Sequence, residues 1–408
     1  LVSPALAKPV AGARTLILLD NAEDQAVYSR FFKSLADRGH EITFQLPKDG
    51  SPQLITYEEL SYDHLVVLAP KIEAFGGELG VGAVIEFINS GGNVLLAGSS
   101  SISEAIRDLS IEFSVDFDEQ GTAVTDHASH VGDDHNLVIA RSRPAPLHPA
   151  SPSASAGPVL FRGVGHRLTG KNPLVQPILV GEPSSYSFET RESVRLEGSP
   201  LLGSGIALVS ALQARNNARV VFSGSADLFS DAGAKSGNEE FATALSEWAF
   251  QERGVLRIVK HKHHRLNEVD QHGIYRIKDE MVYYIEISEW RSGAWHAYRA
   301  TDIQFEAIML DPYIRATFKP HPVSKSATAA PYEATFKLPD TYGVFTFKVD
   351  YKRHGYSWLL ESETVQVRPF RHNQYPRFLS AAYPYYANAI SMMVAFFVFS
   401  AVFLYNRE

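Results

Sequence analysis

The sequence predicts an α/β region, then an antiparallel β-sandwich, then one membrane-spanning helix. Three observations lead to this prediction. Apolar runs of strand length alternate with helical patterns over the first part of the chain, strict two-residue alternation follows, and a long uncharged run stands near the end. A chain of 408 residues is also too long for one small core, so more than one domain is expected.

Residues 14–141 alternate between strand and helix patterns. Short runs made almost wholly of aliphatic side chains predict buried strands at Leu16–Leu19, Ile42–Leu46, Leu65–Leu68 and Val94–Leu96. Strand, helix and strand with short connections imply a parallel sheet covered by helices, as in Rossmann and flavodoxin arrangements.

Two helices are predicted between these strands. The first has apolar residues at helical spacing and a glycine at a C-cap position: Val27, Phe31, Leu35 and Gly39. The second has the same spacing and ends before a glycine pair: Val84, Phe87, Ile88, Gly91 and Gly92.

A segment rich in Pro, Ser and Ala, residues 142–158, has the composition of a flexible surface loop. Beyond it the α/β style resumes, with strands expected at Ile206–Leu212 and Arg219–Ser223 and a helix over Asn238–Arg253. We therefore expect residues 159–254 to form a second α/β unit packed on the first.

Residues 255–368 change from a helical to an alternating period. Phe345, Phe347 and Val349 point one way, while Thr346 and Lys348 point the other. Similar strands are expected at Val282–Ile287, Ile303–Ile308, Ile314–Phe318, Ala334–Leu338 and Thr364–Val367. This spacing predicts an antiparallel β-sandwich, followed by a linker over residues 369–386.

Residues 387–405 form a run without a charged side chain. As a helix at about 1.5 Å per residue, the run spans roughly 28 Å, close to the hydrocarbon thickness of a bilayer. Tyr383, Tyr385, Tyr386 and Tyr405 flank it, as aromatic residues do at membrane interfaces. The run predicts a transmembrane helix in a lipid bilayer, with a buried C-terminal core helix as the alternative.

One face of this helix carries small and polar residues that suit a second helix. Ala387, Ser391 and Ala395 repeat every four residues, and Asn388 and Ser391 could form hydrogen bonds across a helix contact. These four residues are the candidates for packing against a partner helix.

Composition excludes several kinds of chemistry. The formal net charge of −8 argues against nucleic acid as the main partner, because phosphate binding needs a basic surface. The chain has no cysteine, so disulfides, thiolate metal sites and thiol nucleophiles are excluded.

Parallel strands bind ligands at their carboxyl ends, which directs attention to Asp20, Asn21, Gly98, Ser99 and Ser100. No segment has the G-x-G-x-x-G, P-loop or G-x-S-x-G pattern. The sequence therefore identifies no catalytic and no cofactor-binding residue.

Two features could suggest a metal. The tripeptide Asp116–Asp118 has the D-x-D form that many glycosyltransferases use, but strand alternation produces the same pattern. Two polar stretches are rich in histidine but lack the i, i+4 pair of zinc enzymes: His127, His130, Asp133, Asp134 and His135, then His261, His263 and His264. Solvated loops are the favoured interpretation, and no metal site is predicted.

Several longer segments resemble one known family, the 48 kDa subunit of dolichyl-diphosphooligosaccharide–protein glycosyltransferase. They follow the order of that family: LILLDN (Leu16–Asn21), FFKSLADRGHEITF (Phe31–Phe44), LQARNNARVVFSGSADLFSD (Leu212–Asp231), FKLPDTYGVFTFKVDY (Phe336–Tyr351) and AAYPYYANAISMMVAFFVFSAVFL (Ala381–Leu404).

The resemblance implies a single-pass type I protein of the endoplasmic-reticulum membrane, with most of the chain in the lumen. It implies an accessory, non-catalytic subunit that helps to assemble and stabilise the oligosaccharyltransferase complex. That complex transfers an oligosaccharide from dolichol diphosphate to Asn of N-x-[ST] sequons. The implied partners are the polytopic catalytic subunit, ribophorin I and II-type subunits and the small defender-against-cell-death-type subunit.

Charges beside the helix favour the opposite orientation. Arg368, Arg371 and Arg377 precede the span and Arg407 follows it, so the positive-inside rule would place the large region in the cytosol. Two other functions stay open: an enzyme with a ligand near Asp20 and Ser99, or a membrane-anchored recognition ectodomain.

Overall fold

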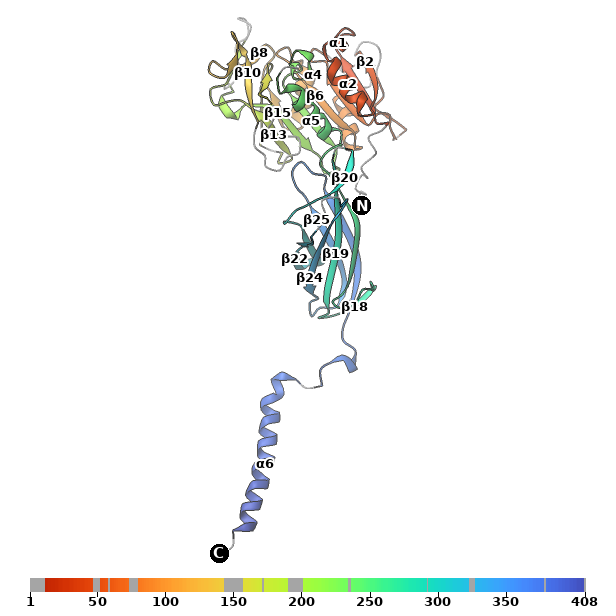
Figure 1. Cartoon of the computed structure of the whole chain (residues 1–408), viewed down its shortest axis with the longest axis vertical. Coiled ribbons are helices and arrows are strands. Elements are labelled where there is room, and N and C mark those ends of the chain that lie inside the picture. The colour runs from red at the N-terminus through yellow and green to blue at the C-terminus, as the bar shows by residue number, and fades with distance from the viewer. Residues whose placement is uncertain are drawn as a thin grey trace.

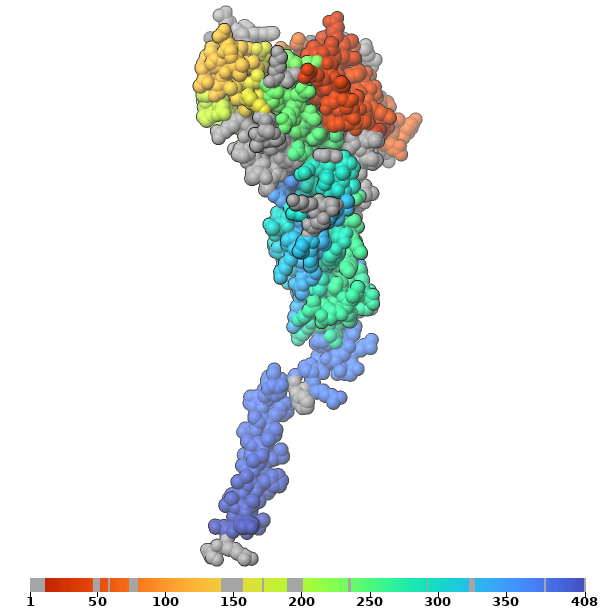
Figure 2. Space-filling view, viewed as in Figure 1, coloured from red at the N-terminus to blue at the C-terminus, as the bar shows by residue number. Residues whose placement is uncertain are grey.

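The computed structural model describes residues 12–46, 52–57, 59–72, 80–142, 157–170, 172–189, 201–233, 236–291, 293–322, 327–377 and 379–406. In that part of the chain an α/β head lies at one end of the long axis, and a body of long strands extends from it (Figure 1). A linker then leads to one helix, which stands clear of the rest (Figure 2).

The head is built on one mixed sheet of 12 strands. It is parallel over five neighbouring strands: β2 (Glu41–Gln45), β1 (Arg14–Leu19), β5 (His64–Leu68), β6 (Asn93–Ala97) and β16 (Arg219–Ser223). It continues antiparallel through β15 (Ala207–Gln213), β13 (Val175–Val180), β10 (Asp134–Ser142) and β11 (Val159–Phe161). The four strands predicted for the first region are present as β1, β2, β5 and β6.

Shorter strands complete the head. β7 (Val115–Phe117), β9 (His130–Val131) and β12 (His166–Leu168) join the large sheet, whereas β8 (Thr122–Thr125) pairs with β14 (Tyr186–Glu189), and β3 (Ile55–Thr56) with β4 (Glu59–Leu60).

Both faces of the large sheet are covered. Ile17 and Leu19 contribute to a core with α2 (Ser29–Asp37) and α5 (Asn238–Ala249), while Leu16 and Leu18 contribute to a second core. α3 (Val81–Asn89) and α4 (Glu104–Glu112) cover that second face. Burial on both faces explains why these strands are continuous apolar runs.

The first predicted helix is divided in two. α1 (Asp24–Val27) ends at Tyr28, whose backbone is not helical (φ −109°, ψ 23°), before α2 begins. Val27 is 47% exposed, so placing it on the buried face was wrong; Tyr28, Phe31, Phe32 and Leu35 form that face instead. Gly39 has φ +93° and ends the segment, as its C-cap position predicted.

The segment expected to form a second α/β unit continues the first sheet. β16 pairs in parallel with β6, and the hairpin partner β15 extends the sheet in the antiparallel direction. Asn217, at φ +69°, makes the turn between β15 and β16. The predicted helix is α5, which ends at Ala249 and lies on the same core as α2. Residues 143–156 of the predicted loop lie outside the described residues.

The body consists of two five-stranded sheets around one core. The first contains β17 (Val255–Arg265), β19 (Glu280–Arg291), β20 (Ala294–Ala297), β23 (Lys319–Pro320) and β24 (Ala330–Lys337). The second contains β18 (Ile274–Arg276), β21 (Gln304–Met309), β22 (Asp311–Thr317), β25 (Gly343–Tyr351) and β26 (Leu359–Arg368).

Aromatic side chains join the two sheets. Phe305 on β21 stacks on Phe336 of β24, with ring centroids 4.5 Å apart. Phe345, Phe347 and Val349 are fully buried, as the alternating period predicted. The strand β17 was not predicted, because its sequence is rich in Lys and His and only part of it is buried.

The linker contains two short 3-10 turns, His372–Gln374 and Ser380–Ala382, and leads into α6 (Tyr383–Tyr405). Among the described residues, one helix is long and apolar enough to cross a bilayer, with a mean hydropathy of 2.1, and none of it is buried. The alternative of a buried core helix is therefore wrong.

Candidate functional site

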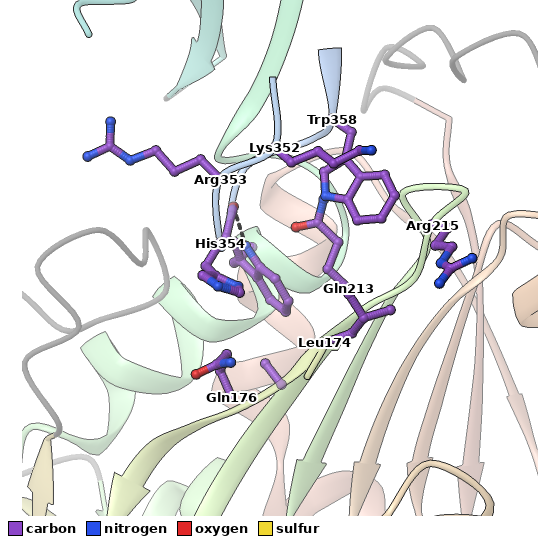
Figure 3. A pocket seen from close by; sticks show the side chains of 11 residues that line it. Leu174, Gln176, Gln213, Arg215, Lys352, Arg353, His354 and Trp358 are labelled. Carbon is purple, nitrogen blue, oxygen red and sulfur yellow. Dashed lines mark hydrogen bonds between the residues drawn. The ribbon is translucent and has the colours of Figure 1, made fainter. Parts of the chain in front are cut away.

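A cleft of about 440 Å³ lies where the head meets the body (Figure 3). The turn between β25 and β26 forms one wall, with Lys352, Arg353, His354 and Trp358. Strands β13 and β15 and the end of α5 form the other. No sequence pattern indicated this site, because its walls lie more than 100 residues apart in the chain.

Hydrogen bonds hold the β25–β26 turn against the head. Trp248 Nε1 donates to the Gly355 carbonyl at 2.8 Å, and Gln213 Nε2 donates to the Tyr356 carbonyl at 2.6 Å. The Trp358 backbone N–H donates to Asn217 Oδ1 at 2.8 Å. Three separate parts of the head therefore fix the turn, and the cleft has a preformed shape.

A buried arginine supports the same joint from within. The Arg219 guanidinium donates to the carbonyls of Trp248, Arg253 and Gly254, each at 2.7 Å, and lies 4.8 Å from the centre of the Trp248 ring. Burial lowers its pKa to about 9, so it keeps its charge at neutral pH. It ties the end of α5 and the start of β17 to β16.

The cleft is lined by cationic and aromatic side chains. Arg215 and Lys352 supply cationic groups and His354 an imidazole, whereas the Arg353 guanidinium donates to the hydroxyls of Tyr298 and Tyr351; no described acidic residue lines the cleft. Lys352 Nζ lies 3.2 Å from Asp350 and 5.1 Å from the centre of the Trp358 ring. Such a lining suits an anionic or carbonyl-rich group rather than a nucleophilic reaction.

One buried polar atom lies beside this cleft. Gln213 is 8% exposed, and its Oε1 has no hydrogen-bond partner among the described residues. Its Nε2 donates to the Tyr356 carbonyl, and the Oε1 atom is itself buried, so it is not exposed to a group bound in the cleft.

The predicted strand-end residues do not form one site. Asp20 and Asn21 follow β1, and Ser99 and Ser100 follow β6, with β5 between these two strands. Ser99 Oγ accepts from the Ser101 backbone at 3.1 Å, which makes a local turn. Asp20 is half-buried, and burial raises its pKa; among the described residues, the Lys71 backbone N–H donates to it at 3.4 Å.

The chain itself occupies the carboxyl ends of β6 and β16. Gly98 accepts from the Ala226 backbone at 2.7 Å, and Val164 donates to the Gly224 carbonyl at 2.9 Å. The approach is so close that a Cβ on Gly224 would stand 1.8 Å from the Val164 oxygen. A ligand cannot enter between these two segments.

The D-x-D tripeptide follows strand alternation. Phe117 is buried, while Asp116 pairs with Arg167 at 3.3 Å and Asp118 accepts from the Ser187 hydroxyl. The two carboxylates bind different partners and do not share a site.

The histidine groups also form side-chain contacts. The His135 ring centroid lies 4.5 Å from that of His127 and 4.4 Å from that of His130, and His263 lies 3.2 Å from Glu363. Among the described residues, no three His, Asp or Glu side chains are placed to hold a metal ion.

A buried Ser–His pair was not predicted. His166 Nε2 lies 2.6 Å from Ser210 Oγ, which is a distance typical of a nucleophile and its base. Both residues are fully buried, and burial lowers the pKa of His166 to about 3. Without access for a substrate, this pair has a structural role in the core.

The residues predicted at the membrane all lie on α6 and are exposed. The interfacial tyrosines Tyr383, Tyr385 and Tyr386 occupy its first turn, and Tyr405 ends it. Of the predicted packing face, Ala387, Asn388, Ser391 and Ala395, only Ser391 has a described side-chain hydrogen bond, to the Asn388 carbonyl of the same helix. The face is therefore open to a partner helix.

Comparisons with solved structures give only weak similarities. A carbohydrate deacetylase, Agd3, matches with a TM-score of 0.36 at 8% identity, covering 65% of this chain and 35% of that one. A putative ThuA-like protein from Parabacteroides merdae matches with a TM-score of 0.32 at 14% identity, covering 59% and 90%. Scores this low support no argument about the present chain.

Comparisons with sequences are far stronger. A model of the OST48 N-terminal domain matches residues 6–252, and one of the OST48 middle domain matches residues 263–407. Proteins named as the 48 kDa subunit of dolichyl-diphosphooligosaccharide–protein glycosyltransferase are 42% identical in Danio rerio and Arabidopsis thaliana and 41% in Drosophila melanogaster. These matches cover 97% of this chain and 92 to 93% of the relatives. The chain therefore belongs to the family of the 48 kDa subunit of this glycosyltransferase.

Proposed function

We propose that this chain is a non-catalytic, accessory subunit of the endoplasmic-reticulum oligosaccharyltransferase complex, which it helps to assemble and stabilise. The observation that carries the proposal is the match to named 48 kDa subunits, which extends over 97% of the chain and includes α6. The proposed partners are the polytopic catalytic subunit, the ribophorin I and II-type subunits and the defender-against-cell-death-type subunit.

The geometry of the head supports a role without chemistry of its own. The carboxyl ends of β6 and β16 are closed by the chain at Gly224 and Val164, and the Ser210–His166 pair is buried. The proposal includes a Rossmann- or flavodoxin-like head and a β-sandwich body, divided at about residues 142, 159, 255 and 369.

We further propose a type I orientation, with head and body in the lumen. Protease treatment of sealed microsomes tests it directly. A lumenal head and body stay intact until detergent opens the vesicles, whereas cytosolic ones are digested at once.

The assembly role is tested by a pull-down of the tagged full chain in mild detergent. The eluate is assayed for glycan transfer to an N-x-T peptide. We expect activity to co-purify with a polytopic partner and to be lost when residues 387–405 are replaced by an unrelated apolar helix. A chain that purifies alone, without transferase activity, would contradict the proposal.

Single substitutions then locate the contact on α6. Ala395→Leu enlarges the proposed packing face, and Met393→Leu exchanges side chains of similar size on the opposite side of the helix. Loss of partner subunits only with Ala395→Leu supports this face, and equal recovery with both variants argues against it.

The cleft at the joint favours a second function, recognition of a ligand by the ectodomain. The cations Arg215 and Lys352 and the Trp358 ring suit an acidic segment. Titration of the full chain with a fluorescent acidic peptide tests this, with Arg215→Ala expected to weaken binding. Binding unchanged by Arg215→Ala, or none at all, would leave the cleft without this role.

A further inference from the structure

Exposed apolar side chains gather at the end of the body that lies farthest from the head. Leu310 in the β21–β22 turn is fully exposed, Val269 in the β17–β18 loop is 79% exposed, and Tyr342 in the β24–β25 turn is 65% exposed. Ile274 and Val344, both exposed, lie beside them. Single exposed apolar residues are common on protein surfaces, but Val269, Leu310 and Tyr342 come from three separate loops at the same end of the body.

The pairing of the strands places these loops at the same position along the length of the body. Ile274 on β18 and Val344 on β25 are both paired with Gln366 of β26, one on each side. The β21–β22 turn reaches the same level, because a Cβ on Gly343 would stand 2.6 Å from the Met309 sulfur. The apolar side chains thus form one group, which we call the distal tips: Val269, Ile274, Leu310, Tyr342 and Val344.

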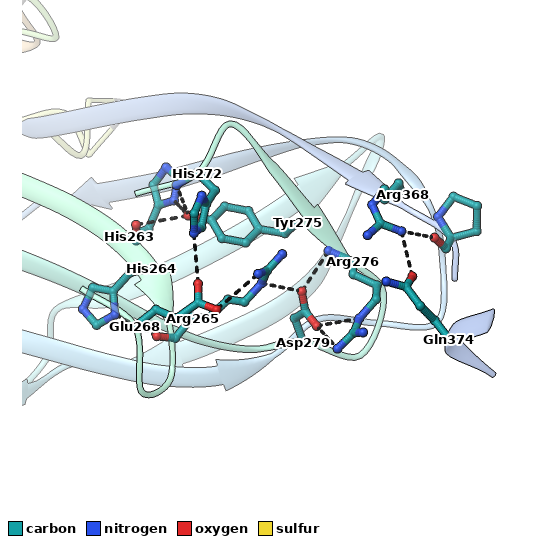
Figure 4. Close-up of polar contacts among 11 residues, drawn as sticks. His263, His264, Arg265, Glu268, His272, Tyr275, Arg276, Asp279, Arg368 and Gln374 are labelled. Carbon is teal, nitrogen blue, oxygen red and sulfur yellow. Dashed lines mark hydrogen bonds and ion pairs between the residues drawn. The ribbon is translucent and has the colours of Figure 1, made fainter. Parts of the chain in front are cut away.

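A polar network holds the β17–β18 loop in shape (Figure 4). Asp279 accepts from Arg265 at 2.9 Å and from Arg276 at 3.0 Å. Within the loop, Glu268 lies 3.0 Å from His272. Since the loop is tied at both ends and across its middle, Val269 is held outward instead of collapsing onto the body.

The chain itself connects this end to the membrane helix. β26 ends at Arg368 beside the distal tips, and α6 begins at Tyr383. The intervening residues could span at most about 50 Å if fully extended, and Arg368 folds their first part back by donating to Gln374 at 2.9 Å. A bilayer that holds α6 therefore lies near the distal tips.

The linker has the composition of an interfacial segment. Arg368 directly precedes it and it contains Arg371 and Arg377, with no acidic residue between residues 364 and 406. Tyr375 and Leu379 are exposed along it. Arginines attract lipid phosphates, and tyrosines favour the headgroup level.

We propose that the distal tips rest on the bilayer surface, with their apolar side chains at the boundary between phospholipid headgroups and acyl chains. The linker arginines contact the lipid phosphates. Phospholipid suits this end better than a protein partner does, because the apolar groups stand on separate loop tips beside a basic, aromatic linker. The proposal rests on the membrane-spanning role of α6 in the proposed function, but not on the other subunits.

The lack of cysteine in the chain permits a direct test. Val269→Cys and Leu310→Cys are each labelled with an environment-sensitive fluorophore in the full chain, which is then reconstituted alone into phosphatidylcholine–phosphatidylserine nanodiscs. Lipids with a quencher near the headgroup are included or omitted. We expect both labels to lose fluorescence to these lipids, and to shift to the blue relative to the same protein in detergent.

Two controls separate the possible outcomes. Phe188→Cys, exposed in the head, is expected to show no quenching, and Val394→Cys, at the middle of α6, is expected to be quenched by lipids labelled deep in the acyl region. Quenching at Val394 but not at Val269 or Leu310 would overturn the proposal and leave α6 in the membrane. No quenching at any position would overturn both the proposal and the membrane anchor. Labels shielded only in the purified complex would assign the tips to a protein partner and would also overturn it.

Discussion

Replacing Arg219 tests whether the joint between head and body depends on one buried charge. Arg219→Met keeps the length of the side chain but removes the donors to the Trp248, Arg253 and Gly254 carbonyls. A buried acceptor left without a partner costs about 1–3 kcal/mol. Three such acceptors sum to about 3–9 kcal/mol, and we expect the lower part of this range, about 3–5 kcal/mol, because Met does not bear the cost of burying a charge.

Local opening of the joint measures this loss better than global unfolding does, since a chain with several cores does not unfold in one step. The backbone N–H groups of Phe250 and Glu252 donate within the end of α5, next to the Arg219 contacts. Their hydrogen exchange, followed by mass spectrometry of the full chain in mild detergent, should accelerate by about a hundredfold to several-thousandfold, the equivalent of about 3–5 kcal/mol.

Arg257→Met is the matched control. Arg257 is exposed and lies 3.8 Å from the centre of the Trp295 ring, an interaction worth about 0.5–1 kcal/mol at a surface. Exchange near α5 should stay unchanged in this variant. If Arg219→Met leaves exchange as slow as Arg257→Met does, the buried guanidinium does not hold the joint.

Three further predictions concern the head. The pKa of His166 is about 3 in the folded protein and about 6.5 in the unfolded chain, so folding stability is lost as the pH falls from about 6.5 towards 3. At about pH 5 the free energy of unfolding is lower by about 2 kcal/mol. His166→Gln should reduce this pH dependence, measured by urea unfolding at several pH values. Gly224→Ala should lower the free energy of unfolding by about 3 kcal/mol, because the added Cβ would clash with the Val164 carbonyl oxygen. Gly205→Ala is the control, since nothing lies within 4 Å of its added Cβ. Equal melting temperatures of the two variants would contradict this prediction. In thermal unfolding, Phe31→Ala should lower the free energy of unfolding by about 3–5 kcal/mol and Val27→Ala by under about 0.5 kcal/mol, because Phe31 is buried and Val27 is exposed. A larger loss for Val27→Ala than for Phe31→Ala would show that Val27 lies on the buried face.

Local sequence patterns located most elements but not their pairing. Continuous aliphatic runs identified β1, β5 and β6, because a strand buried on both faces has little room for polar residues. Whether β16 joins this sheet or starts another depends on contacts more than 100 residues apart, and no local period reports such contacts. The prediction of one continuous helix through Val27 was wrong for a related reason. The apolar residues keep the 3.6-residue spacing across Tyr28, although the backbone there is not helical.

The contacts between head and body could not be predicted from the sequence, for a different physical reason. Arg219 and Gln213 lie in strands that looked ordinary, and their partners are backbone carbonyls, which carry no sequence signal. Trp248 was correctly placed within the helix over Asn238–Arg253, but its indole N–H bonds to Gly355, 107 residues away. The strand-end residues were plausible from topology, but β5 separates β1 from β6, and backbone contacts of Ala226 with Gly98 and of Val164 with Gly224 occupy the ends of β6 and β16.

The joint and the distal tips have a combined consequence for the height of the head. Strand β19 has 12 residues and runs the length of the body, which corresponds to roughly 40 Å at about 3.3 Å per residue. The hydrogen bonds of Trp248, Gln213 and Asn217 fix one end of this distance at the head. With the distal tips on the bilayer, the body would act as a spacer that holds the head at a set distance from the membrane.

A substitution at Arg219 would then disturb the position of the head while leaving the distal tips in place. The same fluorescent labels can detect this: the Arg219→Met variant should keep lipid quenching at Val269→Cys although exchange at the joint accelerates, whereas loss of both together would show that the two ends of the body are not independent.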